Sequence, residues 1–320
     1  MGSALGVTLG AILLVPGGYG HAELGSTIAL GFVLTAVPTL PVSPRAAAAT
    51  VAVRGLSVVG AAVAVLVAAA HPVLLGVATV AAAVLGAVFT RVGPTAALAV
   101  VLIALDVNGE GGTGAAHVFA CAAGAVAALL AWWGWWVCVR AAGGGAEAAA
   151  EFSDPAERPV RRAHAARIGV AVTVAVLLAA ALPADLVGAH WLVTCVILTV
   201  QPGTRQTGVR LVQRLSGNTV GVVIAAAILG IPLPELVVIG LTVALFVIAM
   251  ALRPVNYTWW AITGPPVLLV ISEYPHLFPW YEGGVRLAMN VLGAAVVVLV
   301  VFVAPALISR TRRAPAKTVG

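Results

Sequence analysis

The stretch His190–Gly221, HWLVTCVILTVQPGTRQTGVRLVQRLSGNTVG, indicates how the whole chain folds. It reads as a membrane helix, a break, a run of arginines and a second membrane helix. The break stands at Pro202-Gly203, because proline and glycine stop a helix. The apolar tail Leu215–Leu229 is too short to cross a hydrocarbon core of about 30 Å at about 1.5 Å per residue. The second helix must therefore begin further back, which predicts that Arg214 lies about one turn inside it.

The composition places the rest of the chain in the bilayer as well. Of 320 residues, 62% are hydrophobic and 9% are charged, with a mean hydropathy of +1.10. Soluble domains do not have this balance. The net charge of +6 does not indicate nucleic acid, because the basic residues occur singly or in small groups between apolar stretches, as topology signals do. The lipid bilayer is thus an expected partner and nucleic acid is not.

The hydropathy pattern predicts an all-α integral membrane protein of about twelve transmembrane helices. If the amino terminus is cytoplasmic, every basic residue except Arg286 falls on the inner side. This asymmetry predicts that both termini are cytoplasmic. The apolar segments span approximately residues 2–16, 22–38, 46–69, 73–90, 94–106, 116–139, 165–182, 186–201, 210–229, 235–252, 257–272 and 284–308.

The two halves of the chain resemble each other. GFVLTAVPTL near residue 31 echoes CVILTVQPGT near residue 195, and Arg54 echoes Arg214. Six spans per half keep both halves in one orientation, which predicts a parallel repeat of the kind that transporters use to build a site between halves. The expected domains are a first six-helix repeat at 1–140, a cytoplasmic linker at 141–166 with a short surface helix at Ala146–Phe152, a second repeat at 167–308 and a basic cytoplasmic tail at 309–320.

Signatures of catalysis are absent from the sequence. The three cysteines have no metal-binding spacing, and the six histidines are scattered singly, mostly at expected interfaces. Asp106 is the carboxylate nearest to a span, but Asn108 and Glu110 beside it indicate an outer loop. We therefore predict no enzyme, no cofactor and no metal site. His190, beside Trp191, is the candidate for a proton-coupling group.

Two arginine–asparagine pairs are the main polar feature of the expected spans. Arg214 and Asn218 lie four residues apart on one helix face, and Arg286 and Asn290 repeat the spacing on the last span. An arginine within a membrane helix indicates a functional site. Alternatively, the arginines reach the interface and the asparagines bond between helices. Because the last span runs inward from the outer face, we expect the two pairs in opposite leaflets.

The span at 257–272 carries a second unusual feature. The sequence TGPP at Thr263–Pro266 predicts an interrupted helix, because two adjacent prolines remove backbone donors. Interrupted helices at membrane depth often line binding sites. Trp259 and Trp260 would suit a flat anionic ring, by stacking beside arginines. The alternative is that they form an interfacial belt near Arg253.

These residues resemble the fusaric acid resistance (FUSC) and aromatic acid exporter family. The resemblance rests on HWLVTCVILTVQP, on RLSGNTVGVVIAAAI and on ALRPVNYTWWAI, and it covers about residues 165–305. The family patterns are Arg-x-x-Gly-Thr-x-x-Gly and Arg-x-x-Asp-Thr-x-x-Gly. Here asparagine replaces the threonine of the first pattern, and the second lacks its aspartate. The two patterns stand at Arg214, Gly217, Asn218 and Gly221 and at Arg286, Met289, Asn290 and Gly293.

The resemblance implies an exporter of organic anions, in particular aromatic carboxylates, in the cytoplasmic membrane of a bacterium. Proton motive force or membrane potential would drive it, because a negative interior favours anion expulsion by about 2.3 kcal/mol per charge at 100 mV. Arg214 would bind the carboxylate at the inner entrance, and Arg286 would belong to an outer station. The full expected substrate site is Arg214, Asn218, Gln201, Trp259, Trp260, Thr263, Arg286 and Asn290.

Two other functions remain open on the sequence. A passive organic-anion channel would carry current without proton coupling. A non-transporting membrane scaffold would hold a partner through its tryptophans or linker, and would have a tightly packed midplane. The sequence also leaves open whether the chain forms a homo-oligomer.

Overall fold

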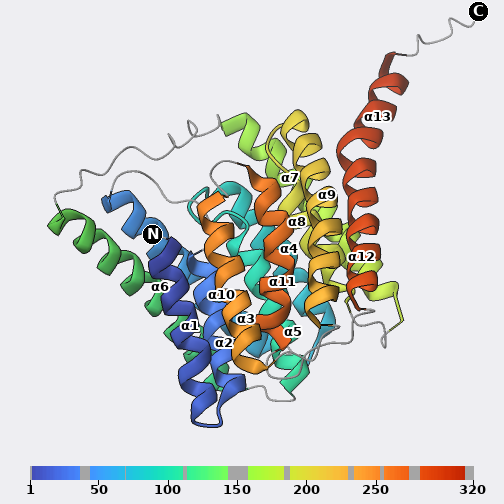
Figure 1. Cartoon of the computed structure of the whole chain (residues 1–320). Coiled ribbons are helices and arrows are strands. Elements are labelled where there is room, and N and C mark those ends of the chain that lie inside the picture. The colour runs from blue at the N-terminus through green and yellow to red at the C-terminus, as the bar shows by residue number, and fades with distance from the viewer. Residues whose placement is uncertain are drawn as a thin grey trace, which may run out of the picture.

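In the computed structural model of the chain (Figure 1), the regular structure of the described residues is entirely helical. The structure describes residues 2–36, 44–68, 70–110, 114–142, 158–183, 188–229, 234–252, 256–273 and 282–313. The helices are α1 (Gly2–Gly18), α2 (Ala22–Ala36), α3 (Pro44–Ala68), α4 (Pro72–Val88), α5 (Thr95–Glu110), α6 (Ala115–Ala141), α7 (Arg158–Ala181), α8 (His190–Thr199), α9 (Thr204–Leu229), α10 (Glu235–Leu252), α11 (Tyr257–Glu273), α12 (Glu282–Val298) and α13 (Ala304–Arg313). A π-helical turn, η1 (Leu299–Val303), joins α12 to α13.

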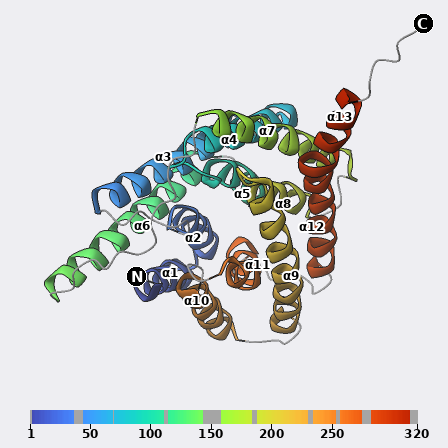
Figure 2. The same ribbon diagram turned by 90° about the horizontal axis from the view of Figure 1, so that it is seen from above.

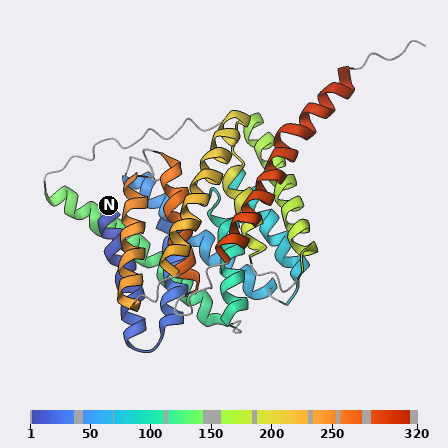
Figure 3. The ribbon, with the colours of Figure 1, turned by 45° about the vertical axis from the view of Figure 1, so that its right-hand side comes forward.

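Each apolar segment expected from the sequence coincides with one of the helices α1 to α12. The boundaries differ at two places. The end of the expected linker, 158–166, already forms the first turns of α7, and α13 continues into the expected tail as far as Arg313. Figure 3 shows α12, η1 and α13 running on as one rod past the end of the bundle. The surface helix expected at Ala146–Phe152 lies outside the described residues.

The apolar helices identify a multi-pass membrane protein. In the described part of the chain, four helices are long and apolar enough to cross a bilayer: Pro44–Ala68, Ala115–Ala141, Pro159–Ala181 and Gly283–Ser309. Other apolar helices, such as α1, α4 and α10, are shorter. Large apolar side chains such as Leu56 and Leu177 are exposed on the outer faces, where lipid would solvate them. That twelve helices span the membrane stays a prediction.

Four helices form the centre of the bundle. Seen from above, α2, α5, α8 and α11 lie inside, and the other helices surround them (Figure 2). The central helices join the two halves of the chain, because α2 packs against α11 and α5 packs against α8. The outer helices also interlock, with α1 against α10 and α4 against α7. The two halves therefore share one core.

Helices six places apart in chain order have matching neighbours. In the first half α2 packs against α6, and α3 packs against both α5 and α6. In the second half α8 packs against α12, and α9 packs against both α11 and α12. The contacts between the halves match in the same way. The first helix of each half packs against the fourth helix of the other half, α1 against α10 and α7 against α4.

Two close glycine contacts extend this match to single residues. In the first half, Gly124 of α6 lies so close to the carbonyl of Ile28 on α2 that a Cβ atom would collide with it. In the second half, a Cβ on Gly293 of α12 would lie 2.8 Å from the carbonyl oxygen of Leu192 on α8. Small residues let membrane helices approach in this way. Each half thus carries a glycine contact at the same place in its own helix pair.

The helix that we expected to be interrupted, α11, is continuous through Gly264, Pro265 and Pro266. The expected break is therefore wrong. The two prolines still deprive the carbonyls of Ala261 and Ile262 of their helical donors. Both carbonyls face α9, where a Cβ on Gly221 would meet them. The absence of a side chain at Gly221 lets the backbone of α9 pack directly against these two carbonyls.

Candidate functional site

The turn between α8 and α9 fixes the start of the helix that carries Arg214. After Thr199 the backbone becomes extended, with φ −69° and ψ 118° at Val200. The Thr207 hydroxyl then accepts the Gln201 N–H at 3.0 Å, and the Gln206 side chain accepts the Gly203 N–H at 3.3 Å. Side chains that reach back in this way satisfy the free donors at a helix start. The expected stop at the Pro-Gly break is confirmed.

Gln201 belongs to this turn. Its side-chain Nε2 donates to the carbonyls of Leu198 and Val200 at 3.4 and 3.3 Å. From α7, the Arg167 guanidinium donates to the carbonyl oxygens of Gln201 and Pro202 at 3.4 and 3.2 Å. Gln201 is not among the described residues that line the cavity at the site, so the structure places it apart from the other expected polar residues.

Arg214 lies deeper in its helix than the expected one turn, because α9 begins at Thr204. The side chain is 5% exposed. Its Nη1 donates to the Tyr257 hydroxyl of α11 at 3.4 Å, and its Nε has no hydrogen-bond partner in the described residues. Arg210 stacks on the same tyrosine, 3.6 Å from the ring centroid. Two guanidinium groups thus converge on Tyr257, which the sequence did not single out.

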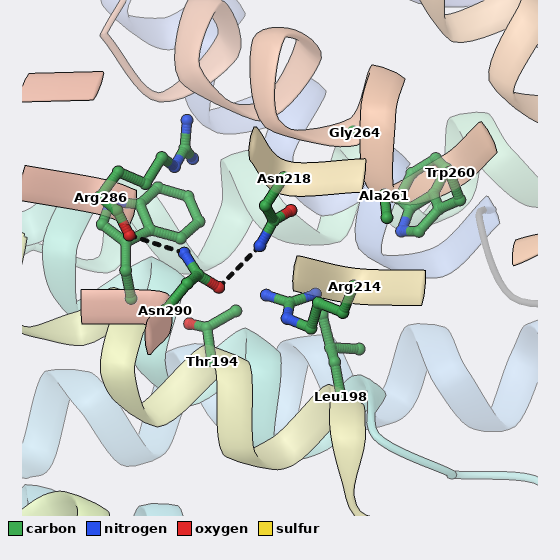
Figure 4. Close-up of a pocket in the computed structure, with 10 residues that line it drawn as sticks. Thr194, Leu198, Arg214, Asn218, Trp260, Ala261, Gly264, Arg286 and Asn290 are labelled. Atoms are coloured by element: carbon green, nitrogen blue, oxygen red, sulfur yellow. Dashed lines mark hydrogen bonds between the residues drawn. The ribbon is translucent and has the colours of Figure 1, made fainter. Parts of the chain in front are cut away.

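Hydrogen bonds between amides connect the two arginine–asparagine pairs. The Asn218 Nδ2 donates to the Asn290 Oδ1 at 2.7 Å, and the Asn290 Nδ2 donates to the Arg286 carbonyl at 2.8 Å. Figure 4 shows the two amides pointing toward each other, with Arg214 beside them. We expected two separate stations, but the two pairs form one site. They meet because each asparagine lies one turn further along its helix than its arginine, and the two helices enter from opposite ends.

Arg286 is held by an aromatic ring from α8. Its guanidinium carbon lies 3.2 Å from the centroid of the Trp191 ring, and the side chain is 3% exposed. A desolvated cation–π contact of this kind contributes about 2 kcal/mol. Trp191 was considered in the sequence only as a neighbour of His190. A sequence pattern cannot pair residues so far apart in the chain, so the contact between Trp191 and Arg286 could be found only in the structure.

These side chains surround a small cavity of about 30 Å³ between α8, α9, α11 and α12. About two water molecules would fill it. Two arginines and two asparagines line it, but no aspartate or glutamate does so among the described residues. The full lining is Trp191, Thr194, Leu198, Arg214, Asn218, Trp260, Ala261, Gly264, Arg286 and Asn290 (Figure 4). The cavity is therefore cationic, rich in donors and partly walled by indole rings.

The remaining expected residues lie outside this lining. Trp259 is 43% exposed. Thr263 is buried, and its hydroxyl donates to the Trp259 carbonyl at 2.7 Å. His190 lies behind the cavity wall, with its ring centroid 4.6 Å from that of Trp191, and its Nε2 is buried without a hydrogen-bond partner in the described residues. Of the aromatic residues expected at the site, Trp260 is the one that lines it.

One expectation about titratable residues is wrong. Asp106 does not lie in an outer loop, because α5 continues to Glu110 and buries its side chain to 6% exposure. Asn108 and Glu110 misled the sequence interpretation, since they prolong the helix instead of ending it.

Comparison with known proteins finds a family match in the second half of the chain. Residues 174–300 match the model of the family described as fusaric acid resistance protein-like. This segment contains the whole lining of the cavity. No curated protein and no solved structure matches the chain. Residues 174–300 are therefore similar to the fusaric acid resistance protein-like family, which supports the resemblance and suggests a membrane transport or resistance function.

Proposed function

We propose that the protein exports organic anions, in particular aromatic carboxylates, across the cytoplasmic membrane. One observation carries the proposal: the buried Arg214 faces a cavity whose described lining contains no carboxylate. An unpaired charge inside a protein is costly, so the site favours an anionic occupant. Asn218 would orient the carboxylate through its amide, and Trp260 would stack on the ring.

The size of the cavity favours a carrier over an open channel. A volume of about 30 Å³ admits water but no aromatic acid. An aromatic carboxylate would fit only after the surrounding helices separate, as expected for alternating access. A passive channel requires a continuous path, and a scaffold needs no polar cavity at all. Both remain outcomes of the test below.

The proposed architecture is a duplicated unit of six transmembrane helices with both termini in the cytoplasm. The matching neighbours of α2 and α8, and of α3 and α9, support the duplication. The equivalent contacts at Gly124 and Gly293 support it independently. The basic residues on the expected inner side support the orientation and the cytoplasmic membrane.

The test is efflux from proteoliposomes loaded with aromatic and aliphatic carboxylates. Each acid is measured with an imposed pH gradient, with a membrane potential alone and with neither. We expect efflux of aromatic acids that responds to the pH gradient. Flux governed by potential alone would identify a channel. Silence across the panel, from protein with a cooperative melting transition, would contradict export and favour the scaffold.

Arg214→Gln tests the site itself. Hydrogen bonds to a charged group contribute about 1.5–3 kcal/mol, which corresponds to a roughly 10- to 150-fold loss of affinity for the carboxylate. Arg205→Gln is the matched control, because Arg205 is exposed on the same helix. We expect Arg205→Gln to bind and export normally. Unchanged binding by folded Arg214→Gln would sink the assignment.

A further inference from the structure

A second polar cluster lies in the first half of the chain, away from the cationic cavity. It joins three helices: Thr27 of α2, Asp106 of α5 and His117 of α6. The Thr27 hydroxyl donates to the Asp106 Oδ2 at 2.9 Å, and the His117 Nε2 lies 4.0 Å from the same oxygen. Asp106 and Thr27 are buried. A carboxylate and an imidazole thus lie beside each other near the end of α5, and both are largely shielded from solvent.

This cluster has features that are typical of a functional site in a membrane protein. Ionisable side chains inside membrane helices are costly to bury and mark ion or proton pathways. At 4.0 Å the imidazole and the carboxylate are close enough to interact electrostatically but too far apart for a hydrogen bond. A proton can therefore be held by either group without a rigid ion pair. Thr27 orients the carboxylate, and it can also donate to the Glu23 carbonyl at 3.3 Å.

The position of the cluster corresponds to that of Arg286 and Trp191 in the second half. His117 precedes the close glycine Gly124 at the same spacing as Arg286 precedes Gly293. Thr27 directly precedes Ile28, whose carbonyl faces that glycine, as Trp191 precedes Leu192. At this place the second half has a permanent cation, Arg286, against an indole ring. The first half has the imidazole of His117 beside the carboxylate of Asp106.

We propose that Asp106 and His117 form the proton-binding site that couples anion export to the pH gradient. This inference rests on the proposed function. A proton from the outer water binds a carboxylate oxygen of Asp106 or a nitrogen of His117, and it is released on the inner side after the helices rearrange. Only an O–H or N–H bond forms and breaks. Under the expected topology the end of α5 that carries Asp106 faces outward, where an exporter takes up its driving proton.

Other titratable groups on nearby helices have to be separated from this site. The helices packed against α5, together with α6, carry Glu23 on α2, Arg54 on α3, His71 at the start of α4, His190 on α8 and Cys121 on α6. His190 was the group expected from the sequence. It lies against Trp191 in the second half, whereas Asp106 and His117 supply two exchanging groups in contact. His190→Gln therefore belongs in the test as a competing variant.

The test compares Asp106→Asn, His117→Gln and His190→Gln with the wild type in proteoliposomes. The matched control is Glu23→Gln, because Glu23 is an exposed acid at the same end of the neighbouring helix. We expect Asp106→Asn and His117→Gln to lose efflux driven by the pH gradient. They should keep exchange of labelled for unlabelled anion, which needs no net proton movement. Glu23→Gln and His190→Gln should keep both activities.

A spectroscopic measurement reads protonation independently of transport. Infrared difference spectra of the detergent-solubilised protein across pH should contain a carboxylic C=O band that is missing in Asp106→Asn. A folded Asp106→Asn that retains gradient-driven efflux overturns the proton site and leaves the exporter intact. An unaltered infrared titration in that variant also overturns it. Absence of anion flux in the wild type overturns the exporter. Where the wild type transports, loss of both exchange and efflux in Arg214→Gln reports the anion site and not the proton site.

Discussion

The two halves of the molecule have matching helix contacts, but the polar side chains at these contacts differ. In the second half, Arg214, Asn218, Asn290 and Arg286 form a polar line around one cavity, in which a hydrogen bond joins the two amides. In the first half the corresponding sequence positions hold Arg54, Val58, Cys121 and His117. The amides are replaced by apolar side chains, so no polar line can form there. If both proposals hold, the two halves of a duplicated frame separate anion recognition from proton binding.

The glycine contacts test the frame itself and should give the largest effect. Gly124→Val in α6 would drive a branched side chain into the backbone of α2, where the Ile28 carbonyl and the Phe32 amide nitrogen leave no room. Overpacking that must move a backbone costs about 3 kcal/mol or more. We expect loss of the folded protein. Gly293→Ala is the milder partner, because its nearest atoms lie at 2.8 Å.

Fluorescence-detected melting and size-exclusion profiles measure this difference. The ordering matters more than the absolute values. If Gly293→Ala destabilises the protein more than Gly124→Val, the two contacts are not equivalent and the proposed duplication loses one of its supports.

His117→Arg gives the first half the cation of the second. A guanidinium beside Asp106 stays charged at all working pH values and would hold the carboxylate in a fixed ion pair. We expect gradient-driven efflux to fall to the level of protein-free vesicles while labelled-anion exchange continues. Efflux that still follows the pH gradient in this variant would show that the imidazole is dispensable. His117→Lys is a further comparison, since lysine can still release its proton.

The amide pair can be removed in a double-mutant cycle. Asn218→Val leaves the buried Asn290 Oδ1 without its donor at 2.7 Å, which should cost about 1–3 kcal/mol in the free energy of unfolding. Asn218→Val combined with Asn290→Cys copies the first half, with Val58 and Cys121. We expect the double variant to lose less stability than the two single variants together. Strict additivity in denaturation midpoints would indicate that the amides do not interact.

Trp191→Phe should give the smallest effect. Phenylalanine keeps an aromatic face for Arg286 but binds a cation more weakly than tryptophan, so the loss is about 0.5–1 kcal/mol. Thermal melting measures the loss of stability, and the inhibition constant of an aromatic acid measures any loss of affinity. A large loss of affinity with unchanged stability would mean that the indole contacts the substrate rather than only the arginine.

The sequence predicted the helices of this protein well and its contacts poorly. The apolar segments, the break at Pro202 and the position of Arg214 inside a helix follow from local rules of helix length and helix termination. The bond between Asn218 and Asn290 does not, because it depends on how α9 and α12 cross. The close packing of α11 depends on glycines in another helix, at Gly217 and Gly221 of α9. The burial of Asp106 depends on helices such as α2, which lies far from it in the chain and donates the Thr27 hydroxyl to its carboxylate.

The small size of the cavity has a kinetic consequence. If the helices around it must part for every substrate, their opening limits the turnover number whatever acid is carried. Acids of different size should then share one maximal velocity and differ only in the concentration that half-saturates the protein. A maximal velocity that falls steadily with the volume of the acid would instead mean that passage through the site, and not its opening, is the slow step.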